Sequence, residues 1–377
     1  MPRKPSASRS SLPRRRSKSM VRSSMLSRVV THRMETPLKI GIVGAGAIGC
    51  YLGCRLAAVG ADVALFGRAS FAAEIAQHGL CAIDMNGHRS VVEKDKVVFA
   101  TEPRVLADCT VLLCCVKSAH TADAARQINP VVRADACVLS LQNGLGNADV
   151  LRANLDGRTA LAGIVGFNVR PLGRGVFQQG TSGAIIIEDD DASRAPVAAL
   201  ARLLTQAGFE VQLAKNIKAL QWAKLMLNLN NAVSALSGVP LRELLASSGY
   251  RHILADLIAE ALAVFGKAGI RPARMGAFPV QWFPFVLRLP TVLFQLLARA
   301  QLKIDPQARS SMWEDLARGR PTEVDYLNGE IVRLAEKHSV DAPLNRRIVE
   351  LVHDAEAKRS GSPAMSAESL SRYLMIA

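Results

Sequence analysis

The sequence predicts an α/β domain built on a parallel sheet, followed by an all-helical domain. Two observations predict this order. The first half of the chain alternates short apolar runs with helical patterns, and several runs end in glycine or polar residues. From about Asn216 one helical pattern follows another without alternating strands. Alternation of this kind is typical of a parallel sheet with helices on both faces. A chain of 377 residues, 49% of them hydrophobic, is long enough for two cores.

The first strand, residues 40–43, runs directly into the hexapeptide GAGAIG and a helical pattern. Gly44 allows the tight turn, Gly46 lets a pyrophosphate approach the backbone, and Gly49 lets the helix pack closely on the sheet. Ala47 and Ile48 would open that helix, whose N-terminus favours phosphate. In this context the glycines indicate a Rossmann-type dinucleotide-binding domain. The alternative is a mononucleotide or flavin fold in which the glycine loop has no such role.

The second strand, residues 62–66, ends near Arg68. NAD-binding domains usually end this strand in an acid that holds the ribose hydroxyls, whereas an arginine suits a 2′-phosphate. The sequence therefore predicts NADPH/NADP+ as the cofactor.

Polar residues follow two later apolar runs, 110–116 and 136–141. Lys117 comes directly after the first run, and Gln142 and Asn143 follow the second. Ligands of open α/β sheets bind outside the carboxyl ends of the strands, so we expect these side chains near the cofactor. A solvated lysine that starts a helix is the alternative for Lys117. Shorter β segments at 159–168, 175–179 and 182–188, a helix at 192–207 and a last strand at 210–213 complete this domain.

The helix predicted over residues 217–236 carries a polar stripe on an otherwise apolar pattern. Lys224, Asn228 and Asn231 fall within about 60° of one another at 100° per residue. Burial of unpaired polar groups is costly, so an aligned lysine and two amides indicate a site. Desolvation would also make the lysine proton easier to transfer, as a general acid requires. An exposed helix face is the alternative.

The stretch 271–303 is apolar but is interrupted by Pro279, Pro284, Arg288 and Pro290. It lacks the roughly 20 continuous apolar residues that span a bilayer. We expect no transmembrane span, and we favour a homodimer contact or a substrate lid, with contact to a membrane surface as the alternative.

Three helical patterns close the second domain, at 310–316, 323–337 and 345–358. Glu323 would lie in the first turn of the second of these helices, where the helix dipole favours an acid. The last residues read as a polar, frayed tail. The predicted organisation is an N-terminal extension, a Rossmann domain, a helical domain and a tail, at 1–34, 35–214, 215–358 and 359–377.

The formal net charge of +15 comes mainly from the N-terminal segment, since residues 1–33 hold ten Arg or Lys and no acid. A segment of this composition is expected to be disordered. It reads as a transit-type presequence, a nucleic-acid-binding arm or, as we prefer, a dispensable extension upstream of a start at Met34. We expect no nucleic-acid partner for the folded part.

All seven cysteines lie before residue 140, several of them within predicted buried elements. This pattern is typical of reduced cysteines that pack as small apolar side chains in the core of a cytoplasmic protein. Cys50 and Cys54 have no histidine nearby, so we expect no metal site.

With these motifs in place, the chain resembles the ketopantoate reductase (2-dehydropantoate 2-reductase) family over roughly residues 38–357. The resemblance rests on GAGAIG, Lys117, QNG at 142–144, WAKLMLN at 222–228, SSM at 310–312 and EVDY at 323–326. It implies an NADPH-binding Rossmann domain and a helical domain like the C-terminal domain of 6-phosphogluconate dehydrogenase, with the substrate in the cleft between them.

The resemblance also implies roles for single residues. Lys224 would be the general acid, while Asn143, Asn228, Ser311 and Glu323 would bind or orient the substrate. Arg68 and Lys117 would hold the phosphorylated ribose end of the cofactor. Glu323 would bind a substrate hydroxyl or keep Lys224 protonated through its charge.

The sequence departs from the family pattern at a few positions. Ala232 stands where a further asparagine is expected, and Asn231 would take its role. His120 stands where a glutamine would contact the cofactor. The expected reaction is NADPH-dependent reduction of ketopantoate to pantoate, in pantothenate and coenzyme A biosynthesis. The alternatives are a reductase of another small 2-keto acid, a relative acting on a 3-hydroxy acid, and a non-catalytic NADP-sensing regulator.

Overall fold

A computed structural model describes residues 38–274, 279–298 and 308–375. The N-terminal extension and parts of the stretch 271–303 lie outside these ranges, so the structure does not bear on their predicted character. The described residues belong to one compact unit.

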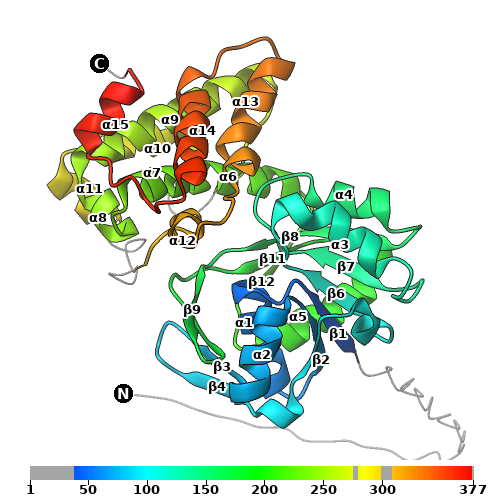
Figure 1. Cartoon of the computed structure of the whole chain (residues 1–377). Helices are drawn as coiled ribbons and strands as arrows, with labels where there is room; N and C mark the ends of the chain where they lie inside the picture. The colour runs from blue at the N-terminus through cyan, green and yellow to red at the C-terminus, as the bar shows by residue number, and fades with distance from the viewer. Residues whose placement is uncertain (1–37, 275–278, 299–307, 376–377) are drawn as a thin grey trace, which may run out of the picture. The chain divides into compact units, whose positions relative to one another are not determined.

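Within the described residues, the main sheet has eight strands in the order β12-β11-β8-β7-β6-β1-β2-β5 (Figure 1). In that order they span Val211–Ala214, Ile185–Glu188, Thr159–Val165, Cys137–Ser140, Val111–Cys114, Lys39–Val43, Asp62–Phe66 and Val98–Ala100. All neighbours are parallel except β11 and β8. The order from β5 to β8 is that of a doubly wound dinucleotide-binding sheet, which confirms the predicted α/β class.

Helices cover both faces of this sheet. Residues of α1 (Ala47–Ala58), α2 (Ala69–His78) and α5 (Arg194–Gln206) share one apolar core with the strands. Residues of α3 (Thr121–Ile128) and α4 (Asn147–Asn154) share a second core on the other face. Both faces of the sheet are thereby buried, as its continuous apolar strands require.

A second sheet of four strands was not expected. Its order is β4-β3-β10-β9, with bounds Arg89–Val92, Leu80–Ile83, Val176–Gln179 and Val169–Gly173. The segment 175–179, predicted as a β segment of the first domain, is strand β10 of this second sheet. Its pairing with β3 joins segments that are distant in the sequence, which local patterns do not report.

The second half of the chain is helical, as predicted. Its helices are α6 to α15, with bounds Ile217–Asn228, Asn230–Ser237, Leu241–Ala246, Ser248–Lys267, Phe283–Leu287, Thr291–Ala298, Ser311–Ala317, Asn328–Lys337, Pro343–Lys358 and Ala367–Tyr373. They share one apolar core, which includes Trp222, Met226 and Ile258.

Three helix predictions need correction. The helix expected over 217–236 is interrupted at Leu229, which separates α6 from α7. Glu323 does not lie in the first turn of α13, because a 3-10 turn (Val324–Tyr326) intervenes and the helix begins at Asn328. The last segment is not frayed throughout: Ser366 caps α15, and Leu370 is fully buried in the helical core.

Candidate functional site

The glycine loop has the geometry that a dinucleotide requires. Gly44 has φ +93°, and a Cβ on Gly49 would lie 2.4 Å from the Gly44 carbonyl oxygen. A Cβ on Gly46, by contrast, would meet no atom within 4 Å, so this side of the loop is open. The N-terminus of α1 at Ala47 has neither a side-chain cap nor an acid in its first turn. Its amide groups are thus left for an anion, and the loop fits the predicted cofactor.

Arg68 lies at the end of β2, in the position from which a ribose phosphate would be read. It is the exposed N-cap residue of α2, and its guanidinium carbon lies 5.6 Å from the centroid of the Phe71 ring. Burial lowers the pKa of Arg320, and the charges of Arg318 and Arg68 act in the same direction. The charges of Asp315 and Glu314 oppose this shift, so Arg320 lies within electrostatic reach of Arg68 and of both acids.

Lys117, at the carboxyl end of β6, is paired with a residue that the sequence did not indicate. Its Nζ lies 2.6 Å from Oδ2 of Asp315 in α12 and donates to the Pro321 carbonyl at 2.8 Å. Asp315 is only 5% exposed, and burial raises the pKa of its carboxyl group. Its other oxygen lies 3.5 Å from Arg320. In the described part of the chain the buried Nε of Arg320 has no hydrogen-bond partner.

Three of the predicted residues meet in one chain of hydrogen bonds. Lys224 Nζ, on α6, donates to Asn143 Oδ1 at 3.0 Å. Asn143 Nδ2, beyond the end of β7, donates to Glu323 Oε2 at 3.2 Å. Burial lowers the pKa of Lys224 to about 8, while the charge of Glu323 opposes that shift. A lysine with this pKa is within reach of proton transfer near neutral pH.

A buried polar network fixes Asn143 and Glu323. The amide of Ser118 donates to Glu323 Oε1 at 3.1 Å, and the Ser118 hydroxyl donates to the Asn143 carbonyl at 2.9 Å. Asn147 Nδ2 donates to the same carbonyl at 2.7 Å. Ser118 and Asn147 are each 5% exposed. Sequence reasoning gave neither of them a role, although both lie close to predicted strand ends.

The other expected substrate residues do not join this chain. In the ranges that the structure describes, the side chains of Asn228, Asn231 and Ser311 make no hydrogen bond to Lys224, Asn143 or Glu323. Asn228 and Asn231 are half-buried, and Ser311 is exposed at the start of α12. The preceding residue, Ser310, is buried instead. Its hydroxyl caps α12 and donates a hydrogen bond to the Asn231 carbonyl at 3.0 Å.

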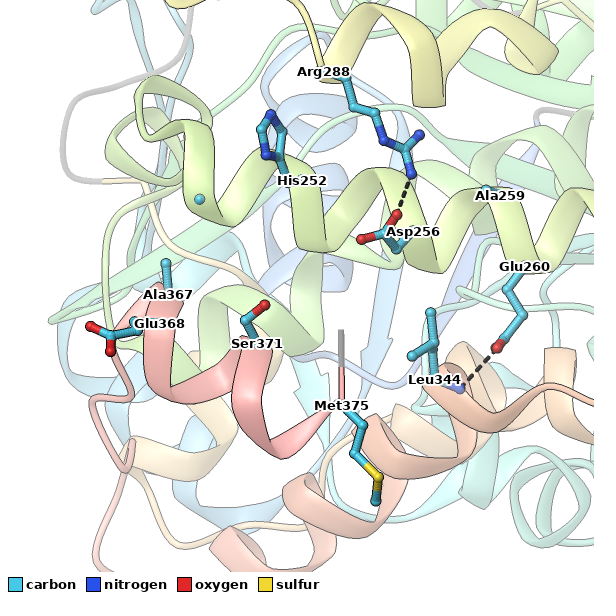
Figure 2. Close-up of a pocket in the computed structure, with 11 residues that line it drawn as sticks. His252, Asp256, Ala259, Glu260, Arg288, Leu344, Ala367, Glu368, Ser371 and Met375 are labelled. Atoms are coloured by element: carbon cyan, nitrogen blue, oxygen red, sulfur yellow. Dashed lines mark hydrogen bonds and ion pairs between the residues drawn. The ribbon is translucent and has the colours of Figure 1, made fainter. Parts of the chain in front are cut away.

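A groove of about 800 Å³ lies elsewhere, between α9, α14 and α15 (Figure 2). Figure 2 shows Arg288 bonded to Asp256 and Glu260 bonded to the backbone of Leu344 along its wall. None of the residues predicted to bind cofactor or substrate lines it. Of the residues described, no group of His, Cys, Asp and Glu could hold a metal ion, and no helix is long and apolar enough to cross a membrane.

Family models match both halves of the chain. One for ketopantoate reductase PanE/ApbA matches residues 40–191, and one for its C-terminal domain matches residues 216–356. The 2-dehydropantoate 2-reductase of Halobacterium salinarum is 29% identical over 85% of this chain and 99% of its own length. That of Pyrococcus horikoshii is 28% identical over 86% and 100%.

Solved structures agree with these matches. A PanE/ApbA family ketopantoate reductase from Ralstonia eutropha has a TM-score of 0.72 and 32% identity, covering 85% of this chain and 99% of its own. A D-mandelate dehydrogenase in complex with NADH and anilino(oxo)acetate has a TM-score of 0.70 and 25% identity, with the same coverage.

Proposed function

Since the chain belongs to the ketopantoate reductase family, we propose that it reduces 2-dehydropantoate (ketopantoate) to pantoate with NADPH, in the route to pantothenate and coenzyme A. It is an oxidoreductase that acts on a CH–OH group. The observation that carries the proposal is the hydrogen-bonded chain Lys224–Asn143–Glu323, which joins an acid–base lysine to the carboxyl ends of the sheet strands.

Reduction of a 2-keto acid needs a hydride and a proton, and a bound nicotinamide supplies the hydride. Lys224 supplies the proton to the developing alkoxide, and its positive charge stabilises that oxygen in a partly desolvated site. The side-chain oxygen of Asn143 accepts a hydrogen bond from the Lys224 ammonium group and thereby orients it. Glu323 keeps Lys224 charged, because a nearby negative charge raises the pKa of an ammonium group.

The residues at the strand ends would hold the cofactor. Amide groups at the start of α1 would bind the pyrophosphate, and Arg68 and Lys117 would bind the phosphorylated ribose. An exposed arginine where NAD-binding domains usually carry an acid favours NADPH over NADH. We also propose a cytoplasmic location, because the seven cysteines are free thiols, as in reducing compartments.

A second candidate is reduction of a larger, aryl-substituted 2-keto acid. The D-mandelate dehydrogenase neighbour, crystallised with NADH and anilino(oxo)acetate, motivates it. Loss of NADPH absorbance, measured with the purified chain on ketopantoate, pyruvate, 2-ketoisovalerate and benzoylformate, separates the two candidates. We expect the highest kcat/KM with ketopantoate and a preference for NADPH over NADH. A maximum on benzoylformate would favour the second candidate, and no turnover on any of them would favour a non-catalytic NADP sensor.

A further inference from the structure

Helix α14 holds the segment that carries Glu323 at both of its ends. The segment runs from Thr322 to Asn328, and we call it the Glu323 turn. At its start the Thr322 amide donates to Glu356 Oε1 at 2.7 Å. At its end Asn328 Nδ2 donates to Asn345 Oδ1 at 3.0 Å. The position of Glu323 therefore depends on a helix to which the sequence assigned no role in the site.

Both contacts come from one face of α14. Asn345 and Glu356 are eleven positions apart on this helix, so at 100° per residue they point within about 20° of the same direction. Val352 lies on the same line between them and is fully buried in the helical core, which also includes Val324 and Leu327 of the Glu323 turn. Helix α14 thus supports the turn with a polar contact at each end and apolar packing between them.

The two polar contacts differ in what else they support. Asn345 is fully buried and also donates to Glu260 Oε1 at 2.8 Å and to the Leu257 carbonyl at 3.2 Å, so it contributes to the packing of α9 on α14. Glu356 is half-buried, and in the described part of the chain its carboxylate has no hydrogen bond or ion pair besides the Thr322 amide. Substitution of Glu356 therefore releases the turn with little cost to the fold.

The hold on Thr322 is passed on to Glu323 through the short backbone between them. Thr322 Oγ1 accepts the Val324 amide at 3.2 Å, so the residues on both sides of Glu323 are tied together. Further along the turn, the Tyr326 carbonyl lies against the loop after β7: a Cβ on Gly144 would lie 2.9 Å from its oxygen. A displaced turn would therefore change how Glu323 meets this loop.

The contacts of Glu323 require accurate placement. Its Oε2 accepts from Asn143 Nδ2 at 3.2 Å, and its Oε1 accepts from the Ser118 amide at 3.1 Å. The two oxygens thus bond to two different groups, and a small shift of the carboxylate weakens at least one of these bonds. Loss of the Asn143 bond would also release the side chain that orients the Lys224 ammonium group.

We propose that Glu356 is a positioning residue for the reaction: through the Thr322 amide it fixes the turn from which Glu323 bonds to Asn143 and acts on Lys224. The inference rests on the proposed reduction, in which Lys224 and Glu323 take part. Glu356 acts by accepting a hydrogen bond at a defined reach, and its own charge is not required.

Three substitutions of Glu356 separate reach from charge. Glu356→Ala removes the acceptor and should lower kcat roughly 10- to 100-fold, the scale of a small misplacement in an active site. Glu356→Asp keeps the charge but is one methylene shorter, so it should be impaired in the same way. Glu356→Gln keeps an oxygen at the original reach and should restore most of the lost rate. Thermal unfolding of each variant verifies the fold.

The matched control is Glu350→Ala. Glu350 is an exposed glutamate of the same helix, and its carboxylate is paired with Arg347 and not with the Glu323 turn. This variant should keep the wild-type kcat.

A double variant distinguishes positioning from a general structural role. If Glu356 acts through Glu323, then Glu356→Ala should change kcat by no more than about twofold when it is added to Glu323→Ala, because no carboxylate is left to position. A general structural role would lower kcat by the same factor in both backgrounds, and that result would overturn the proposal.

A second measurement does not depend on turnover. In protein labelled with ¹³C at the lysine Cε, the Lys224 signal is identified by its loss in Lys224→Ala, and its pKa follows from a pH titration. Glu356→Ala should lower the pKa of Lys224, because the Glu323 charge that raises it is displaced, and Glu356→Gln should leave that pKa in place.

Failure of the proposed reaction and failure of this inference are therefore distinguishable. A wild type that turns over no 2-keto acid would remove the reaction, while the Lys224 titration would still report the placement of Glu323. A folded Glu356→Ala variant with the wild-type Lys224 titration would overturn the inference with or without turnover. So would a Glu356→Gln variant as impaired as Glu356→Ala, because the charge of Glu356, and not its bond to Thr322, would then be what matters.

Discussion

Lys117 and Asp315 form a 2.6 Å ion pair between the carboxyl end of β6 and helix α12. Lys117 is therefore already engaged at the position from which we expect it to hold the cofactor. Arg320 lies 3.5 Å from the other oxygen of Asp315, and its Nε, within the described chain, lacks a partner. If Lys117 turns to a cofactor phosphate, Asp315 keeps Arg320 as a counterion.

Replacement of Asp315 by asparagine should strengthen NADPH binding. The variant keeps the shape of the side chain but no longer competes for the Lys117 ammonium. Because Lys117 is about one-third exposed, we expect a gain of roughly 1 kcal/mol, about fivefold in Kd, rather than the full value of a buried pair. Fluorescence titration with NADPH measures it. Asp325→Asn, at an exposed acid bound to His353, is the control. Unchanged or weaker NADPH binding would count against the competition.

The fold was predictable where local pattern and long-range packing agree. Strands β1, β2, β6 and β7 are continuous apolar runs, because both of their faces are buried, and each is followed by a turn signal. Strands β3 and β4 were not predicted, because they belong to a second sheet that depends on the pairing of β3 with β10, far along the sequence. Glu323 reads as a helix start from its charge, but the 3-10 turn after it moves the helix N-terminus to Asn328.

The candidate site was predictable only in part, because some of its residues are marked by contacts between distant segments and not by a local pattern. Lys224 stands out because a lysine on an apolar helix breaks a local period. Ser118 does not, since its significance lies in a bond to Glu323, 205 positions away. Asp315 resembles an ordinary surface acid in a short helix until its partner is known.

Arg68→Ala should weaken NADPH binding by about 1.5–3 kcal/mol, the scale of a charge-assisted hydrogen bond, and spare NADH. The reason is that Arg68 would contact the 2′-phosphate, which NADH lacks. Titration with both cofactors makes the comparison within one variant. Arg89→Ala, at an exposed arginine on β4, controls for general loss of positive charge. Equal losses for the two cofactors would contradict the assignment.

Deletion of residues 1–33 should leave specific activity unchanged, because every predicted site residue lies beyond them. The same truncation should abolish any salt-dependent binding to DNA, since ten of the cations of the chain lie in that segment. Steady-state kinetics and filter binding at two salt concentrations measure these effects. An inactive but folded truncation would show that the segment contributes to catalysis.

Lys224→Ala should lower kcat by roughly 10² to 10⁴, the usual contribution of a general acid, with the fold intact. The matched control is Lys218→Ala, which removes an exposed lysine from the same helix and should leave kcat unchanged. Thermal unfolding of both variants separates loss of catalysis from loss of structure. Turnover near the wild-type rate in Lys224→Ala would remove this lysine from the mechanism.

The pH dependence of kcat/KM should report the same lysine. With the Lys224 pKa at about 8, the acid form predominates below that pH, and the rate of keto-acid reduction should fall as the pH rises through 8. The charge of Glu323 raises this pKa, so Glu323→Gln removes the upward effect and should move the fall in rate to lower pH.

The control is Asp325→Asn, which removes a nearby exposed acid and should leave the position of the fall unchanged. The decisive quantity is the midpoint of each profile, independent of how far the absolute rate drops. A midpoint that stays in place in Glu323→Gln, or that moves to higher pH, would separate Glu323 from the protonation of Lys224.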